Sequence, residues 1–323
     1  MTKPTTPLTP PRPDGAPADW QPQHTFNFLD DPYLPSSAKA KIVCDVAASL
    51  GQRTDQSFFR TQAQVQMEFA FRVLAAAGLP VALDSTYELL TSERMLKNVM
   101  AKIEKKKSDE ANELIEHFVF ALKSQPPEQL GGVKTTVTNY LKFFTDPDIS
   151  AVFCPAKSTV TMADLDRGKK ICVSVPQRFH VERRYVNTLL KLAFYAHALR
   201  RFDRSAEQRA QDNLLIFWAG EAPKVVTASA DGLSDYGVVD VIREAKATFV
   251  GDTQSYISLI PPLGDEKKAK VLIANLANRI TFKAADEDSA KIAADTLGKR
   301  KVKKRTYGYS AGRSNTSWTD EAR

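Results

Sequence analysis

The spacing of apolar residues is helical in the first half of the chain and becomes strand-like near residue 170. Between Ser36 and Thr145, apolar residues recur every three or four positions, which is typical of helices that bury one face. The predicted helices cover residues 38–50, 56–77, 85 to about 107, 109–124 and 135–144. This part of the chain is predicted to form a helical bundle, and no residue pattern in it indicates chemistry.

Local signals mark where these helices begin and end. Glycines suited to ending a helix stand at Gly51 and Gly78. The side chains suited to capping a first turn are Ser36 or Ser37, Asp55, Ser85 paired with Glu88 as a capping box, and Ser108.

Four short apolar runs of strand length follow, at residues 170–176, 213–219, 247–253 and 279–285. Helical spacing alternates with them, at residues 181–202, 234–246, 265–277 and 286–297. Runs without in–out alternation, separated by helices, indicate parallel strands covered on both faces. The predicted fold is therefore an α/β layer with helices on both faces of a parallel sheet, preceded by an all-α domain.

These patterns divide the chain into four parts. Residues 1–35 are a Pro-rich lead that is expected to be extended, and residues 36–150 are the all-α domain. Residues 151–297 hold the α/β layer, and residues 298–323 form a basic C-terminal tail.

Much of the positive charge lies in that tail. The formal net charge is +7, and residues 298–323 hold eight Lys or Arg against two acids, so the rest of the chain is almost neutral. The tail also carries Tyr307, Tyr309 and Trp318, so it could bind nucleic-acid phosphates and stack on bases, or it could be a solvated tail. If it binds DNA, the contacting residues are expected to be Lys299, Arg300, Lys301, Lys303, Lys304 and Arg305.

Several protein classes are disfavoured by composition. No run of 18 apolar residues is present to span a bilayer, and the N-terminus has no apolar core of the signal-peptide kind. Cys44, Cys154 and Cys172 are far apart in apolar contexts and are predicted to be reduced core residues. The four histidines do not cluster with each other or with the cysteines, so no metal site is predicted.

Polar residues follow the predicted strands at the positions where α/β sheets bind ligands, which is beyond the carboxyl ends of the strands. Gly220 and Glu221 follow the second strand, and Gln254 follows the third. A carboxylate and a carboxamide on neighbouring strand ends could orient an attacking water and sense a terminal phosphate. The alternative is that Glu221 and Gln254 only cap helices.

The segments "LLIFWAGEAPKVV", "DVIREAKATFVGDTQSYISLIPPLG" and "VLIANLANRITFKAADEDSAKIAADTLGKRKV" resemble the C-terminal half of the TraG/TraD coupling proteins. These are RecA-like, ATP-driven DNA translocases of bacterial conjugation and type IV secretion. The resemblance covers most of the chain: "FNFLDDP" is similar to the segment before the family's all-α insertion, and residues 36–145 are similar to that insertion.

The resemblance implies roles for individual residues. Glu221 stands at the Walker B glutamate, with Pro223 matching the proline that often follows, and Gln254 stands at the motif glutamine. Arg243, 11 residues before Gln254, stands where ring-shaped relatives carry an arginine that reaches the neighbouring subunit's nucleotide. The alternative for Arg243 is a surface arginine paired with Glu244 or Asp240. Asn275 and Arg279 are the polar residues of the last family segment, and either could instead be a helix-end hydrogen bonder.

Two departures from the family pattern limit the expected activity. A Walker A loop requires G-x-x-x-x-G-K followed by Ser or Thr, and the only two Gly-Lys steps, at Gly168 and Gly298, lack the earlier glycine and the hydroxyl. Gly220 stands where the family has an Asp that organises Mg²⁺, and a compensating role for Asp252 is open. Nucleotide binding by Gly220 and Gln254, with ATP and Mg²⁺, is therefore expected only within a complete motor, and no cofactor is expected for the chain alone.

The resulting hypothesis is that the chain is the C-terminal part of a coupling protein whose Walker A and membrane half is separate or lost. The resemblance implies single-stranded DNA, a relaxase or type IV secretion components, and a homo-oligomeric ring as partners, and a place at the cytoplasmic face of the inner membrane. The alternative hypothesis is a nucleotide-independent DNA-binding or adaptor protein derived from a decayed motor.

Overall fold

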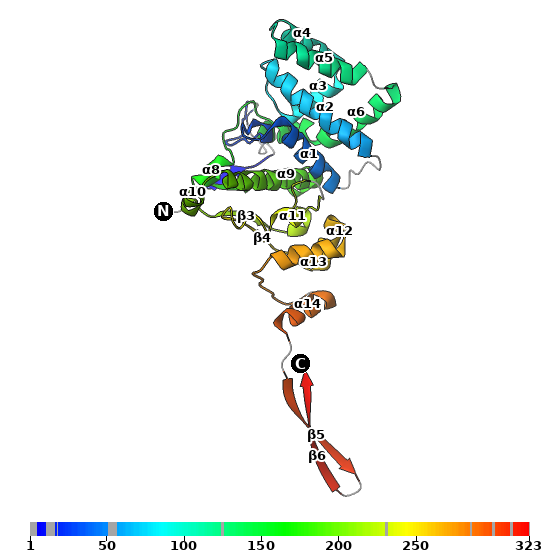
Figure 1. Cartoon of the computed structure of the whole chain (residues 1–323), viewed down its shortest axis with the longest axis vertical. Helices are drawn as coiled ribbons and strands as arrows, with labels where there is room; N and C mark the ends of the chain where they lie inside the picture. The colour runs from blue at the N-terminus through cyan, green and yellow to red at the C-terminus, as the bar shows by residue number, and fades with distance from the viewer. Residues whose placement is uncertain are drawn as a thin grey trace.

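The computed structural model describes residues 5–10, 17, 19–50, 57–123, 126–229, 232–284, 286–298, 301–310 and 313–322. The helical region lies at one end of an elongated molecule, helix α9 and two short parallel strand pairs lie in the middle, and a hairpin lies at the other end (Figure 1). The fold class is the predicted one, an all-α region followed by parallel strands that alternate with helices.

The helical region closely follows the apolar pattern. Its helices are α1 (Ser36–Ser49), α2 (Ser57–Ala76), α3 (Leu83–Thr91), α4 (Glu93–Glu104), α5 (Asp109–Lys123), α6 (Pro127–Leu141) and α7 (Pro147–Phe153). Gly78 ends α2 in the left-handed conformation, and the Ser108 hydroxyl accepts a hydrogen bond from the N–H of Ala111 at the start of α5, both as predicted. Gly51 and Asp55 fall outside the described residues.

Two predicted caps are wrong. Ser85 lies inside the first turn of α3, whose cap position is Ala82, so the spacing of Ser85 and Glu88 is not a capping box. The predicted single helix is instead interrupted at Ser92, whose hydroxyl caps α4 through the N–H of Met95 at 3.3 Å. Helix α1 begins at Ser36, and its cap position, Pro35, has no side-chain hydrogen bond.

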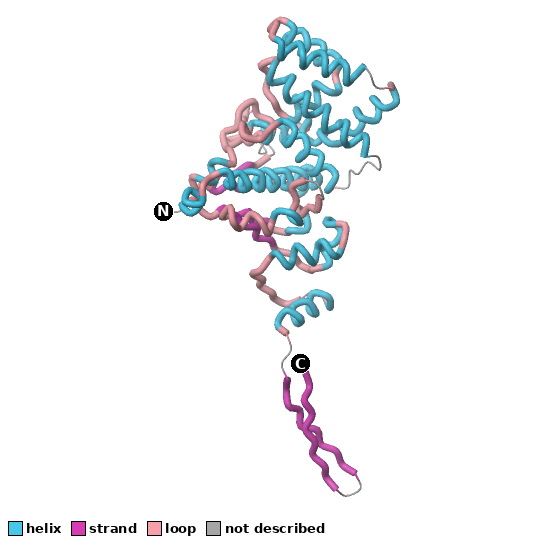
Figure 2. Tube along the Cα trace, in the orientation of Figure 1, coloured by secondary structure: helices cyan, strands magenta, loops and turns pink. Residues whose placement is uncertain are grey.

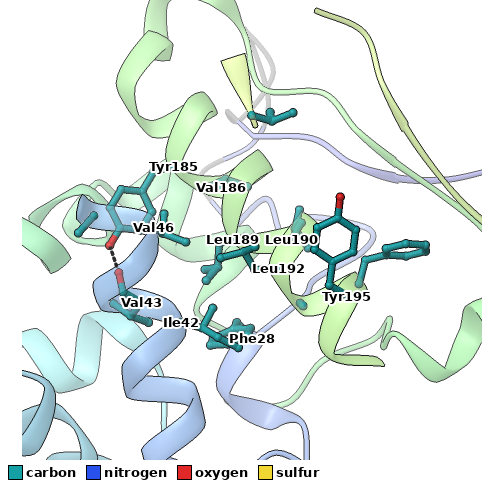
Figure 3. Packing of buried hydrophobic residues seen from close by; sticks show 14 of the residues in the cluster. Phe28, Ile42, Val43, Val46, Tyr185, Val186, Leu189, Leu190, Leu192 and Tyr195 are labelled. Carbon is teal, nitrogen blue, oxygen red and sulfur yellow. Dashed lines mark hydrogen bonds between the residues drawn. The ribbon is translucent and has the colours of Figure 1, made fainter. Parts of the chain in front are cut away.

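Helix α9 (His180–Leu199) is the centre of the larger core. Its buried side chains pack between α1 on one side and the strands on the other, and Figure 3 shows Leu189 and Leu192 near Ile42 and Phe28. The hydroxyl of Tyr185 donates a hydrogen bond to the carbonyl of Val43 at 3.3 Å. The core therefore connects the helical region directly to the α/β layer. A second cluster lies among α2, α3, α4 and α5.

The N-terminal lead contributes to the fold. Strand β1 (Thr5–Leu8) pairs in parallel with β2 (Lys170–Val173), and Leu8 is fully buried. Farther along, Phe26, Asn27 and Phe28 are buried, and the Asn27 amide donates to the carbonyls of Val81 and Pro155. The extended conformation predicted for the lead is present in β1, but the segment is part of the core because its apolar side chains are covered.

The predicted nucleotide-type layer contains the parallel pair β3 (Leu215–Ala219) and β4 (Ala247–Gly251), shown below α9 in Figure 2. Leu215 and Phe217 face α9, and the Phe217 ring lies 5.6 Å from that of Phe194. The alternate residues Leu214, Ile216 and Trp218 are exposed. Coverage on both faces was predicted, and the face of β3 turned away from α9 lacks it among the described residues.

The segment before β4 is not the predicted helix over residues 234–246. Only α11 (Asp235–Val238) is helical, and hydrogen-bonded turns continue to Lys246. Lys246 has a φ of 52°, and its Nζ donates to the carbonyls of Ala210 and Asp212. These bonds turn the chain sharply so that Ala247 can begin β4.

The predicted strand over residues 279–285 is also absent from its described part, residues 279–284. The chain after β4 forms α12 (Ile260–Leu263), α13 (Glu266–Asn275) and α14 (Glu287–Leu297), and the intervening segment exposes Ile280 and Phe282 almost fully. Arg279 donates hydrogen bonds to the carbonyls of Ile273 and Leu276, so it closes the end of α13. A strand needs a partner with free hydrogen-bonding groups, and no described strand lies against this segment.

The basic tail forms a hairpin in which β5 (Lys301–Ser310) pairs antiparallel with β6 (Arg313–Ala322). The hairpin is a separate two-stranded sheet. Lys299 and Arg300 lie outside the described residues, while Lys301, Lys303, Lys304 and Arg305 lie on β5.

The three cysteines are free, but only two are core residues. Cys44 and Cys154 are buried, and burial raises the pKa of the Cys44 thiol to about 12. Cys172, on β2, is exposed, contrary to the prediction. In the described part of the chain, no helix is both long and apolar enough to cross a membrane.

Candidate functional site

Glu221 and Gln254 follow neighbouring strands at the same edge of the sheet. In the parallel register of β3 and β4, Ala219 is opposite Gly251, so the residues just beyond both strands meet at one rim. Glu221 comes two residues after β3, and Gln254 comes three residues after β4. Both side chains are exposed. The structure therefore places the two predicted residues at a common rim.

The turn that carries Glu221 is held by Asp252. Glu221 has a φ of 65°, a left-handed conformation that is uncommon for a residue with a side chain. The Asp252 carboxylate accepts a hydrogen bond from the N–H of Glu221 at 2.5 Å, and the Asp252 carbonyl accepts one from the N–H of Ala222 at 2.8 Å. The open question about Asp252 thus has a structural answer, because its carboxylate fixes the backbone of the Glu221 turn.

The Glu221 carboxylate forms an ion pair with Lys224 at 2.5 Å, one turn along in the 3₁₀ segment η5 (Ala222–Lys224). Both side chains are about half exposed, so solvent screens this pair. A ligand that offers Lys224 another anion could therefore release the carboxylate at little cost.

The two glycines at this rim differ in what they permit. A Cβ on Gly220 would meet no atom within 4 Å, so the space for an aspartate at that position exists. A Cβ on Gly251 would lie 2.7 Å from the Phe249 ring and 2.8 Å from the Cβ of Ala222, so Gly251 is required for the β3 turn to approach β4. Sequence analysis singled out Gly220 and missed Gly251.

Arg243 does not join Glu221 and Gln254 within the chain. It is exposed in the turns before β4, so the length of that strand separates it from the rim. Five strand residues span roughly 16 Å. The structure gives Arg243 no ion pair with Glu244, Asp240 or any other described residue, which removes the alternative role considered for it.

A cleft of about 770 Å³ lies beside the rim, on the side of β3 that faces β2 and α9. Four of its lining residues carry cationic or protonatable groups: His180, Arg183 and Arg184 at the start of α9, and Lys224 after β3. Gln177 and Asn187 add neutral polar groups, and no carboxylate lines the cleft.

The cations of this cleft are held by short-range contacts. Arg184 donates from Nε to the carbonyl of Lys224 at 3.2 Å, which ties α9 to the turn after β3. Burial lowers the pKa of Arg184 from its ordinary value, but a guanidinium stays protonated at neutral pH. Among the described residues, neither Arg183 nor Arg184 forms an ion pair with a carboxylate. The cleft is therefore suited to an anion.

Below η5, a buried network fixes the same turn to α9. The Lys191 ammonium is fully buried and contacts the Val225 carbonyl at 2.6 Å, the Thr227 hydroxyl at 3.2 Å and the Asp235 carboxylate. Tyr195 donates to the other oxygen of Asp235 at 2.5 Å. Burial lowers the pKa of Lys191 and raises that of Tyr195. The network anchors the chain that leads away from the rim.

Comparison with known proteins bears on this arrangement. Residues 239–321 match the family model of the type IV secretion-system coupling protein DNA-binding domain. The fold is similar to the bacterial conjugative coupling protein TrwBΔN70 in an unbound form, with a TM-score of 0.57, 14% identity, and coverage of 93% of this chain and 64% of that one. The chain is a relative of the conjugative coupling proteins.

Two further coupling-protein structures give the same picture. TrwB in complex with a non-hydrolysable ATP analogue matches with a TM-score of 0.59 at 12% identity, over 97% of this chain and 66% of that one. TrwBΔN70 in complex with sulphate matches with a TM-score of 0.59 at 13% identity. This chain spans a little under two thirds of the length of these coupling proteins. No curated protein matches the chain.

For a coupling-protein relative, the rim does not by itself suit an ATP–Mg²⁺ complex. The Asp252 carboxylate is bonded to the Glu221 backbone, Glu221 is paired with Lys224, and Gly220 offers no ligand. No group of three His, Cys, Asp or Glu side chains that could hold a metal occurs among the residues with described positions. The sequence has no phosphate-binding glycine loop, so no reaction step through nucleotide follows from these residues alone.

The sequence contained a signal for the cleft that the analysis did not use. The strand-end rule points to the residues after β2, but it was applied only to the first two, whereas His180, Arg183 and Arg184 follow within the first turns of α9. The opposite wall, Pro261, Pro262 and Gly264, comes from the segment after β4 and has no local signal.

Proposed function

We propose that residues 1–323 form the C-terminal part of a conjugative DNA-transfer coupling protein, and that ATP hydrolysis requires a Walker A loop from outside these residues. The observation that carries the proposal is the shared rim of Glu221 and Gln254 on parallel strands of a coupling-protein fold. The family match and the coverage of under two thirds of TrwB support it.

In this proposal Glu221 activates water and Gln254 senses the terminal phosphate, with Gly220 and Gln254 beside the nucleotide. ATP and Mg²⁺ bind only in the complete motor. Because Arg243 lies at the other end of β4, it acts on nucleotide held by a neighbouring subunit of a ring rather than on its own rim. DNA is the transported substrate, with relaxase or type IV secretion components as partners at the cytoplasmic face of the membrane.

The experiment compares ATP turnover by the chain alone and in the presence of a polypeptide that carries the Walker A loop and membrane helices. We expect no turnover alone and turnover in the mixture, which Glu221→Gln and Gln254→Ala abolish. Arg243→Ala should lower the rate by about 10³-fold or more, the usual contribution of an arginine finger. Steady turnover by the chain alone, removed by Glu221→Gln, would contradict the proposal.

Trp218 provides a second readout that does not depend on activity. Its exposed position on β3 should become covered when the missing half binds, so its fluorescence should shift to the blue. The measurement uses a Trp20→Phe, Trp318→Phe background so that only Trp218 reports. An unchanged spectrum in a mixture that hydrolyses ATP would show that the half docks elsewhere.

A second candidate function is a nucleotide-independent DNA-binding adaptor. The observation that favours it is the rim itself, where Gly220 leaves no metal ligand although an aspartate would fit. The two functions differ in their genetic setting: an adjacent open reading frame with a Walker A motif supports the motor, and its absence supports the adaptor.

A further inference from the structure

We propose that the cleft beside the rim, lined by His180, Arg183, Arg184 and Lys224, binds the phosphodiester backbone of single-stranded DNA. This inference rests on the proposed function for the identity of the polyanion as DNA. It does not rest on ATP hydrolysis, and it assigns DNA to a place other than the basic tail.

The cleft is separate from the rim residues that the hydrolytic role needs. Its lining takes Gly220, Pro223 and Lys224 from the chain after β3, but it includes neither Glu221, nor Asp252, nor Gln254. A ligand in the cleft therefore lies on the β2 side of β3, whereas Gln254 lies on the β4 side. The cleft and the rim can be occupied at the same time.

The charge of the cleft selects an anion. Three permanently charged side chains line it without any lining carboxylate, and two of them, Arg183 and Arg184, have no acidic partner among the described residues. Half-buried cations without counterions are costly unless an anion accompanies them, because burial removes part of their hydration. Phosphate is the anion that guanidinium groups bind in bidentate geometry.

Size and shape favour a single strand. The cleft volume of about 770 Å³ is that of a small-molecule pocket, whereas duplex DNA has a major groove about 12 Å wide and a larger overall diameter. The walls contain three prolines and no aromatic side chain apart from His180. Stacking on bases is therefore not the main contact, and the cleft should read backbone charge with little sequence preference.

Lys224 connects the cleft to the rim. Its side chain lines the cleft and pairs with Glu221, and its carbonyl accepts the hydrogen bond from Arg184. A phosphate bound in the cleft competes with Glu221 for the Lys224 ammonium. DNA in the cleft would thus leave the Glu221 carboxylate free, which gives a route from DNA binding to the hydrolytic residue.

The test is the salt dependence of binding by the full chain, without nucleotide, to a fluorescent 20-nucleotide oligo(dT), followed by anisotropy. Arg183→Ala and Lys224→Ala should each weaken binding and reduce the log–log salt slope by about 0.7, the value for one lost phosphate contact on single strands. Arg178→Ala is the matched control, because Arg178 is exposed on the same segment, stacks on Phe179 and does not line the cleft.

Several outcomes decide the matter. Equal losses for Arg178→Ala and Arg183→Ala, or no loss for Arg183→Ala and Lys224→Ala, would overturn the assignment. Arg183→Lys should keep the slope, which separates lost charge from damaged structure, and melting curves of each variant check folding. Displacement of oligo(dT) by millimolar ATP would identify a mononucleotide site instead, and equal affinity for a 20-base-pair duplex would exclude a cleft that admits only single strands.

Discussion

Asp252 shows how a single carboxylate can fix a functional turn. Its side chain accepts the N–H of Glu221 at 2.5 Å, and its backbone pairs with Ala219 and Ala222. This contact holds Glu221 in the left-handed conformation, which costs on the order of 1 kcal/mol for a residue with a Cβ. The position of the candidate catalytic glutamate therefore depends on a residue of the neighbouring strand.

Removing this contact is expected to destabilise the chain modestly. Asp252→Ala should lower the free energy of unfolding by about 1 kcal/mol, because the Glu221 N–H loses its charged acceptor but can reach water. Asp252→Asn keeps an acceptor oxygen and should lose less than half as much. Urea unfolding measures both variants, and an equal loss in the two would show that the carboxylate charge, not the hydrogen bond, is responsible.

His197 gives a pH-dependent prediction at the same scale. Its ring is buried, Nε2 lies 3.0 Å from Asp166, and Nδ1 lies 3.2 Å from the guanidinium of Arg200, with Arg201 also nearby. Burial lowers the His197 pKa below its ordinary value of 6.5, and Asp166 only partly opposes this shift. Below pH 6.5 the unfolded chain thus binds a proton more readily than the folded chain does.

Stability contributed by neutral His197 is therefore complete above pH 6.5 and is lost as the pH falls from 6.5 through the lowered folded-state pKa. Urea midpoints measured between pH 7.5 and 5.5 should decrease toward acid, and His197→Gln should flatten that slope. A wild-type midpoint that rises toward pH 5.5 would mean that the Asp166 pairing outweighs burial.

At the scale of elements, α9 and the turn after β3 are joined by the buried Lys191–Asp235 pair. Lys191→Met should lower the free energy of unfolding by about 3–5 kcal/mol, because Asp235 would remain as a buried charge without its cation. Lys191→Met with Asp235→Leu should recover much of the loss, since removing both members of a buried pair is far less costly.

The control for this variant is Lys270→Met. Lys270 pairs with Glu266 on the surface of α13, where solvent screens the interaction, and its removal should leave the urea midpoint unchanged. A loss in Lys191→Met no greater than that in Lys270→Met would indicate that the buried network contributes no stability, and the double variant would then show no recovery.

The comparison of predicted and observed elements shows which local signals were sufficient. The apolar runs of β3 and β4 are strands because each pairs with the other, whereas the equally apolar run from Arg279 stays unpaired and exposed. A pattern of side chains indicates strand propensity, but pairing depends on a neighbour that the pattern does not contain. The helix predicted before β4 failed for a related reason, because Lys246 must reverse the chain to start the strand.

The candidate site divides in the same way. Glu221 and Gln254 could be placed together in advance, because the carboxyl ends of adjacent parallel strands always meet at one rim. The cleft could not, because its walls combine α1, α9, the β3 turn and the loop before α13, which only the tertiary fold brings together. Asp252 was noticed by its proximity to Gln254, but its bond to the Glu221 backbone is a consequence of the β3–β4 register.

The hairpin at the end of the chain has a different relation to the rest. It is a separate two-stranded sheet, and such a hairpin is only marginally stable by itself. Truncation after Leu297 should leave the melting temperature of the remaining chain unchanged. If the tail also neutralises DNA phosphates, truncation should reduce the oligo(dT) salt slope further than the cleft variants do. An unchanged slope would leave DNA binding to the cleft alone.

For the whole molecule, the decisive feature is the uncovered face of β3. Leu214, Ile216 and Trp218 alternate along the strand, so they share one face, and their exposed fractions are 57%, 53% and 74%. Parallel sheets normally bury both faces, and here α9 covers only the opposite one. An apolar strand with an unpaired edge is prone to association, so the purified chain should self-associate at micromolar concentration.

Light scattering and sedimentation velocity can assign that association to the β3 face. Trp218→Ser should shift the chain toward monomer, because it removes the largest apolar group from the contact. Leu297→Ser is the matched control: Leu297 is 89% exposed, but it stands at the end of α14 rather than on the sheet. A monodisperse wild-type monomer would show that the exposed face is tolerated in solution. Equal effects of the two substitutions would show that association follows general surface hydrophobicity. If the Walker A polypeptide covers this face, adding it should disperse the wild-type assemblies as Trp218→Ser does, since both remove the same surface from water.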